Sequence, residues 1–358
     1  GGRKLLRIMA SRYGKAVNLP DFVRKSQMMN HEGFKAMYEG RMAQMHAPME
    51  GVLLWMSVPT QPSFVWQMMH YDLEPNSSLY ALKSACEPVH VQLNDVDGGR
   101  IQVVNHTDRS LDLTAHCRVY GLDGKLIAEK QFDVDAAPSA TTDVDGMEWV
   151  YPLDEVHFVK LNLTDRTGRE VSENFYWKGA ASAPDRLTAL DSLPVVRLKA
   201  KASVRKASSK TYVDVTFQNP GKVPALMAHM QLRRAGSMER VLPVFYSDNY
   251  VSLLPGERRT VTIEADDADL KGEKPLVLVD GWNVDVTPSK MVALNRNAQV
   301  DSRERGEFTF VAPELVACDT VRMNCAGYGY DGFTGDPGFL DAPIGFIVED
   351  IYTDGVTD

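Results

Sequence analysis

The sequence predicts a multidomain fold: the terminal part of a (β/α)8 barrel, mostly helical with one buried strand, followed by two immunoglobulin-like β-sandwiches and a β-rich tail. Three observations predict it. Apolar residues recur at helical spacing before residue 46, and from residue 91 the period changes to two. A segment of small residues and prolines then separates two series of alternating strands. The chain of 358 residues, 44% hydrophobic and 24% charged, is long enough for roughly two to three domains with packed cores.

The first predicted element is a long amphipathic helix over residues 18–45. Pro20 and Asp21 stand in its first turn, where helices favour proline and acidic residues. Apolar residues recur every three or four positions, which predicts that one face packs on an apolar surface. This face consists of Phe22, Val23, Met29, Phe34, Met37, Tyr38 and Met42. We expect its methionines to fill a core rather than to bind a cofactor.

A buried strand is expected over residues 51–56, because this continuous apolar run fits a strand covered on both faces. A loop rich in Trp, Pro and Gln follows, and then a second helix that Asn76 caps and that stops at Pro88. Helix, buried strand, loop and helix form one repeat of an α/β barrel. One and a half repeats cannot close a barrel. Residues 1–90 therefore either pack on the β domains or belong to a barrel whose front half is missing.

From residue 91 apolar and polar residues alternate, and turn sequences such as 122–125 and 165–168 separate the runs. This spacing predicts an immunoglobulin-like sandwich over residues 91–180. We expect a linker over 181–194 and a second sandwich over 195–287, with turns at 219–221 and 253–257. Residues 288–358 hold further alternating segments, which predict a β-rich tail or part of an accessory module.

The net charge and the cysteine spacing limit the classes of function that the chain can have. A net charge of −9 argues against nucleic acid as a partner, and the basic run 197–210 is interpreted as a solvated face. No apolar run is long enough to span a membrane, and the opening residues do not resemble a signal peptide. The cysteines lack the spacing of a zinc site, so we expect no metal and no cofactor. Among the four cysteines, Cys318 and Cys325 either form a disulfide bridge across a hairpin or remain buried free thiols.

Two separate stretches carry recognisable motifs. The first comprises Gly51, Leu53, Trp55, Met56, Pro62, Ser63, Trp66, Gln67, Tyr71, Asp72, Leu73, Pro75, Lys83, Ala85, Cys86, Glu87 and Pro88. The second comprises residues 245–264 and 280–285. Together they resemble glycoside hydrolase family 2, most of all the subgroup of exo-β-D-glucosaminidases and mannosylglycoprotein endo-β-mannosidases. The resemblance covers residues 1 to about 287. Val58 and Gln61 depart from the pattern of some relatives, which leaves the sugar open.

The resemblance implies the C-terminal region of a retaining β-glycosidase that acts on β-glucosaminides or β-mannosides in carbohydrate metabolism. Such enzymes use two carboxylates that flank the scissile bond, and the resemblance places both on earlier barrel strands. The glutamates of the barrel part are Glu32, Glu39, Glu50, Glu74 and Glu87. None stands where the nucleophile is expected, so we expect no catalytic residue and no activity in this chain alone. The resemblance further implies a β-linked glycan as substrate, a missing N-terminal barrel half in the full-length protein, and a periplasmic or secreted location.

The expected substrate-binding residues are Trp55, Ser57 and Gln61. Trp55 ends the predicted barrel strand on the face where barrel active sites lie, so its indole either stacks on a sugar ring or packs inside the barrel. Ser57 belongs to the loop that follows. Gln61 either binds sugar hydroxyls or satisfies backbone groups of its own loop. Asp72 is expected to pair with an arginine or to cap a turn.

A second function class is a non-catalytic carbohydrate-binding or structural multi-sandwich protein. In this alternative the tail is the binding end, where aromatic and acidic residues gather in a glycine-rich stretch, residues 327–343. Those aromatic residues either bind sugar or pack within the loop, and the carboxylates match no ordered calcium loop. His106 and His116 lie in alternating strands and are interpreted as surface residues of a sheet.

Overall fold

The computed structural model describes residues 2–46, 51–55, 57–60, 67–94, 99–285, 287–288 and 290–291. Within them the α-helices come first: α1 (Gly2–Tyr13), α2 (Leu19–Met42) and α3 (Ser77–Ala85). Strands and two short 3-10 helices, η1 (Thr188–Ser192) and η2 (Asp267–Leu270), make up the remaining elements. None of the helices described combines the length and apolarity that a membrane span requires. The predicted tail beyond residue 291, with Cys318 and Cys325, lies outside the described residues.

Both predicted helices are present, and asparagines begin them. The Asn18 side chain accepts a hydrogen bond from the backbone N–H of Asp21 at 2.9 Å, and the Asn76 side chain accepts one from that of Ser78 at 3.0 Å. Pro20 lies in the first turn of α2, where its missing N–H leaves no hydrogen bond unmade. Of the predicted apolar face, Phe34 and Tyr38 are buried, whereas Val23 is 43% exposed; Met28, which the prediction did not include, is fully buried.

The first sandwich consists of two antiparallel sheets. One has the order β1 (Val89–Asn94), β2 (Arg100–Asn105) and β5 (Ala140–Asp145). The other has the order β4 (Leu126–Ala136), β3 (Leu111–Gly121), β6 (His157–Asp165) and β7 (Glu170–Lys178). Along β3 every second side chain is buried, which follows from the period-two pattern of its sequence. The inward-facing residues of the two sheets, such as Ile101 and Cys117, form one core.

The second sandwich also consists of two sheets. One sheet has the order β12 (Val251–Leu253), β10 (Ala225–Arg234), β14 (Pro275–Asp280) and β15 (Thr287–Pro288). The other has the order β11 (Phe245–Tyr246), β13 (Arg258–Asp266), β9 (Lys210–Gln218), β8 (Lys199–Ala207) and β16 (Lys290–Met291). The strands described in these sheets pair antiparallel, except for the parallel pair β8 and β16. Gly256 adopts a positive φ of 83° in the predicted turn 253–257, a conformation that glycine adopts without strain.

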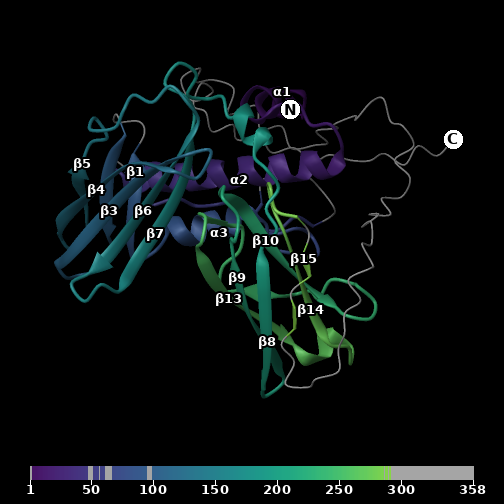
Figure 1. The fold of residues 1–358 in the computed structure, drawn as a ribbon. Helices are drawn as coiled ribbons and strands as arrows, with labels where there is room; N and C mark the ends of the chain where they lie inside the picture. The colour runs from purple at the N-terminus through teal and green to yellow at the C-terminus, as the bar shows by residue number, and fades with distance from the viewer. Residues whose placement is uncertain are drawn as a thin grey trace.

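The helices and both sandwiches meet in a third apolar core. Figure 1 shows α2 lying across the two sandwiches with α3 beside it. Residues from the segment between the sandwiches enter this core: Leu187 and Leu190 are fully buried, and the Trp282 indole donates a hydrogen bond to the Leu190 carbonyl at 2.9 Å. The segment 181–194, which we expect to link the sandwiches, is therefore held against both neighbours rather than being a free spacer.

The described residues of the predicted strand 51–56 form no strand in this chain. Residues 51–55 adopt no regular structure, Leu53 is fully exposed and Trp55 is 73% exposed. A strand requires a neighbour for its backbone hydrogen bonds, and no strand in the described part of the chain pairs with this segment. The described helices of residues 1–90 pack on both sandwiches through the third apolar core.

Candidate functional site

The candidate site is the segment after α2, residues 51–60 and 67–75, where the sequence places its substrate-binding residues. Trp55 and Ser57 are both exposed on this segment, and Gln61 lies outside the described residues. The carbonyl of Ser57 accepts a hydrogen bond from the N–H of Met69 at 3.2 Å. The two limbs of the segment therefore lie side by side, with Trp55 close in sequence to the point where they meet.

Residues 68–76 form a tight turn. The His70 N–H donates to the Glu74 carbonyl at 2.9 Å and the Leu73 N–H to the His70 carbonyl at 3.0 Å. Leu73 has a positive φ of 66°, which a leucine adopts only where its surroundings fix it. The Asn76 N–H closes the turn on the Met68 carbonyl at 3.0 Å. The turn thus presents His70, Asp72 and Glu74 together.

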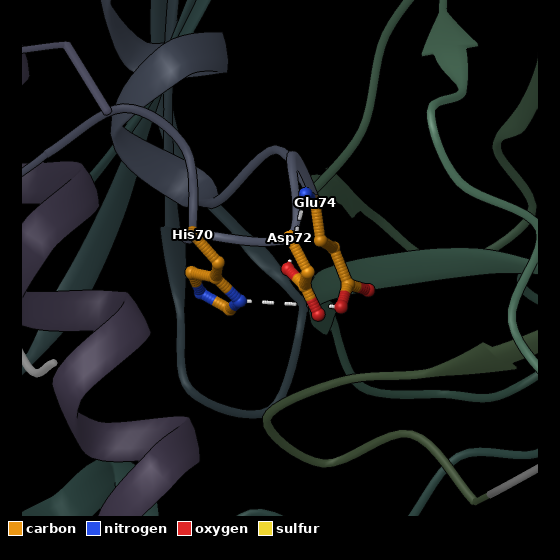
Figure 2. Close-up of side chains that lie close together, drawn as sticks. All are labelled: His70, Asp72 and Glu74. Carbon is orange, nitrogen blue, oxygen red and sulfur yellow. Dashed lines mark hydrogen bonds and ion pairs between the residues drawn. The ribbon is translucent and has the colours of Figure 1, made fainter. Parts of the chain in front are cut away.

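Figure 2 shows the side chains of His70, Asp72 and Glu74 converging, and their ligand-type atoms lie within 4.8 Å of one another. Imidazole and carboxylate groups at this spacing are the donors that a divalent cation uses. Arg240 of the second sandwich, however, forms ion pairs with both carboxylates, at 2.6 Å to Asp72. Its guanidinium supplies the positive charge that balances them.

This cluster is therefore an electrostatic clamp between the turn and the second sandwich. Burial lowers the pKa of His70 below its usual 6.5, so the imidazole is neutral at neutral pH. Asp72 also accepts a hydrogen bond from the backbone N–H of Glu74 at 3.3 Å. Both roles foreseen for Asp72, pairing with an arginine and capping a turn, are realised at once.

The described glutamates of the helical part are each engaged by neighbouring groups. Glu32 accepts hydrogen bonds from Arg12 and Tyr13, and Glu74 pairs with Arg240. Glu39 and Glu87 both bind His90, as described below. Glu50 lies outside the described residues. A retaining pair requires two carboxyl groups about 5–5.5 Å apart that face a sugar; these four instead serve as internal ion-pair partners.

A buried polar network joins α2 to the first sandwich, and sequence reasoning missed it. The His90 ring lies between two carboxylates, 3.1 Å from Glu39 and 3.1 Å from Glu87. Glu39 also accepts hydrogen bonds from Asn174 at 2.6 Å and from the Tyr176 hydroxyl at 2.9 Å. Glu39 and His90 are almost completely buried, so these contacts form in a low-dielectric environment.

The electrostatics of this network favour charged partners. Burial alone would lower the pKa of His90, but its hydrogen bonds to Glu39 and Glu87 raise it above the usual 6.5. Burial alone would raise the pKa of Glu39, but the hydrogen bond to His90 and the charge of Lys35 lower it. One sequence signal was present: Lys35 and Glu39 follow the core residues Phe34 and Tyr38 directly, on the inner side of α2.

Comparisons with known proteins match this architecture. Residues 99–180 match the family described as mannosidase Ig/CBM-like domain, and residues 174–284 match the exo-β-D-glucosaminidase Ig-fold domain. Over 301 residues, 77% of this chain, the sequence is 34% identical to the exo-β-D-glucosaminidase of Amycolatopsis orientalis. The chain is a homologue of exo-β-D-glucosaminidases. The resemblance that the sequence predicts is thereby confirmed.

Other relatives agree. A mannosylglycoprotein endo-β-mannosidase of Lilium longiflorum is 26% identical over 76% of this chain. The crystal structure of the Amycolatopsis orientalis exo-chitosanase superposes with a TM-score of 0.73 at 30% identity, over 80% of this chain. A β-D-mannosidase from Dictyoglomus thermophilum shares the fold, with a TM-score of 0.60 at 17% identity.

The matched region is only part of these relatives. It covers 29% of the Amycolatopsis glucosaminidase, 34% of the lily mannosidase and 36% of the exo-chitosanase chain. This chain thus spans about a third of the length of the proteins that it matches. It carries two immunoglobulin-like domains that are typical of the C-terminal region of glycoside hydrolase family 2.

Proposed function

We propose that this chain is the C-terminal region of a retaining β-glycosidase that acts on β-glucosaminides or β-mannosides. In this proposal residues 1–90 complete a (β/α)8 barrel, and the catalytic glutamates belong to the part of the protein that precedes residue 1. Trp55, Ser57 and Gln61 then line the sugar-binding end of that barrel. The chain as given has no turnover of its own and requires no metal.

The exposure of Trp55 carries the proposal. The indole of Trp55 is 73% exposed beside the fully exposed Leu53, so together they offer apolar surface to another part of the protein or to a ligand. The segment next to it, residues 67–75, is anchored on the second sandwich through Arg240. Residues 67–75 are thus fixed to the second sandwich while Trp55 stays exposed. This arrangement suits a segment that contributes Trp55 to a sugar-binding site whose other residues belong to the preceding part of the protein.

The remaining strands of a barrel also supply what residues 51–55 lack. Parallel strands on both sides would provide hydrogen-bond partners for this apolar run and cover its side chains. Their arrangement would turn the C-terminal end of the strand, where Trp55 stands, toward the active-site face. The predicted strand then forms only when the barrel closes.

The test compares this chain with a fusion that restores the missing part. We expect the purified chain to leave p-nitrophenyl β-D-glucosaminide and p-nitrophenyl β-D-mannoside unhydrolysed. Fusing the preceding two thirds of the Amycolatopsis glucosaminidase to its N-terminus should give hydrolysis of one of them. In the fusion, Trp55→Ala should lower kcat/KM about tenfold or more, because burying an aromatic side chain contributes roughly 1.5–3 kcal/mol.

The matched control is Phe245→Ala, which removes an aromatic side chain that is 63% exposed on the second sandwich. It should leave kcat/KM unchanged. Hydrolysis by the unfused chain above the buffer blank would overturn the assignment of the catalytic residues to the preceding part. Equal kcat/KM for the two alanine variants would overturn the role of Trp55.

A further inference from the structure

A cavity of about 500 Å³ lies between α2 and the first sandwich, apart from the residues of the candidate site. Its wall is formed by α2, the end of β1, the residues before β6 and the end of β7. Four aromatic side chains line it: Tyr151, Phe175, Tyr176 and Trp177. Its volume lies within the range of about 300–1,000 Å³ that is usual for small-ligand sites.

Two residues that line this cavity each carry a buried polar atom without a partner. Among the described residues, neither the Gln92 Oε1 nor the Trp177 Nε1 has a hydrogen bond. Gln92 is completely buried and Trp177 is 5% exposed. An unsatisfied buried polar atom costs roughly 1–3 kcal/mol. A ligand that forms a hydrogen bond with each of the two atoms would recover part of this free energy on binding. One atom is an acceptor and the other a donor.

The orientation of the Gln92 amide is fixed by its own contacts. Its Nε2 donates to the Glu39 carbonyl at 3.0 Å and to the Gln102 Oε1 at 3.0 Å. Both of these partners are acceptors, so the nitrogen must face them and the oxygen is the atom left over. The unpartnered acceptor is therefore a consequence of the network around Glu39.

The charges along the wall are balanced within the protein. Arg12 pairs with Glu32, and Glu39 pairs with His90. The Lys35 ammonium donates to the Phe175 carbonyl at 2.8 Å and also to the Asn174 side chain. The lining holds the cations Arg12, Lys35 and Lys178 and the carboxylates Glu32, Glu39 and Asp185, so its formal charges balance and favour no ion of either sign. A neutral molecule fits this wall best.

The cavity is open at one side. Gly40, Pro152, Pro184 and Asp185 of its lining are exposed, whereas Gln92 and Trp177 are buried. The lining thus joins exposed and buried residues, so a ligand can enter this cavity from solvent.

We propose that this cavity binds the pyranose ring of a neutral saccharide. The apolar C–H face of the ring contacts the aromatic side chains, one hydroxyl donates to the Gln92 Oε1, and a hydroxyl oxygen accepts from the Trp177 Nε1. Hydroxyl groups suit this pair because each is both a donor and an acceptor. The site goes beyond the proposed function, since it uses neither Trp55 nor any residue of the missing catalytic part.

The experiment is a titration of the intact chain with methyl β-D-glucopyranoside and methyl β-D-mannopyranoside, followed by saturation-transfer NMR and calorimetry. We expect millimolar binding of at least one. Trp177→Phe keeps the ring but removes the N–H and should weaken binding about tenfold, the size expected for one lost hydrogen bond to an otherwise unpaired group. Gln92→Met removes the acceptor and should also weaken binding.

Two controls define the outcome. Trp149→Phe removes another buried indole N–H without a partner in the same sandwich, but outside the cavity lining, and should not change the affinity. Trp55→Ala should not change it either, so failure of this proposal and failure of the proposed function are distinguishable. No binding by the wild-type chain would show that water alone satisfies the two atoms and would overturn the proposal. Equal weakening by Trp149→Phe and Trp177→Phe would do the same.

Discussion

The long helix α2 and the segment 51–60 that follows it show opposite behaviour, although the sequence assigns both to one barrel repeat. α2 is regular and its inner face is buried, with charged partners on the segment between the sandwiches, Lys25 with Asp191, and on the first sandwich, Glu39 with His90. Residues 51–55 are irregular and Leu53 is fully exposed. The difference teaches that a helix satisfies its backbone by itself and only needs a surface, whereas a strand needs neighbours.

The largest effect should come from breaking the attachment of α2 to the first sandwich. Glu39→Ala leaves His90 buried between a cavity and one remaining carboxylate. We expect the free energy of unfolding to fall by about 3–5 kcal/mol, as for other buried ion pairs that lose one partner. Chemical denaturation followed by circular dichroism measures it.

The control for that change is Glu129→Ala, which removes an exposed carboxylate that pairs with His116 at 3.1 Å. It should cost about 0–1 kcal/mol. If both variants lost the same stability, the buried network would not be what holds α2 in place.

A smaller effect should come from releasing the turn 68–76 from the second sandwich. Arg240→Met removes the partner of Asp72 and of the buried Glu74, with an expected loss of about 1.5–3 kcal/mol, the range for hydrogen bonds to charged groups. Faster hydrogen exchange at residues 67–75 should accompany it. Arg197→Met, at an exposed pair with Asp285, is the control and should leave exchange at residues 67–75 unchanged. Unchanged exchange in Arg240→Met would contradict the clamp.

The smallest effect should be a dependence on pH. Because the folded-state pKa of His90 is raised, its contribution is fully present below about pH 6.5 and is lost as the pH rises through the folded value. Because the folded-state pKa of Glu39 is lowered, its contribution is present above about pH 4.5 and is lost as the pH falls through the folded value. The stability gap between wild type and His90→Gln should therefore be widest between these two values and narrow above them. Urea denaturation across this range measures it, and a gap that widened above pH 6.5 would contradict the assignment.

The parts of the fold that local pattern determines could be predicted. The alternation along β3 follows from the period of its own residues, the start of α2 from Pro20 and Asp21, and the start of α3 from Asn76. These features depend on residues close in the chain, so a single sequence displays them.

The parts that depend on distant partners could not be predicted. Arg240 is 168 positions from Asp72, and no local pattern links the two. Residues 51–55 have a composition typical of a buried strand, but that state needs strands that no described part of the chain provides beside them. The roles of Trp55 and Ser57 stay predictions for the same reason, since the surface that would face them belongs to the proposed missing part.

The packed segment between the sandwiches has a mechanical consequence. Leu187 and Leu190 are fully buried in the core shared with α2, and the Trp282 indole donates a hydrogen bond to the Leu190 carbonyl. Rotation of one sandwich relative to the other would therefore expose this core to solvent. The two sandwiches then act as a single rigid unit that supports α2 and the turn 68–76. A domain that packs on α2 and the turn 68–76 is therefore held in one orientation relative to the sandwiches. This orientation aligns the residues of a site that come from distant parts of the chain.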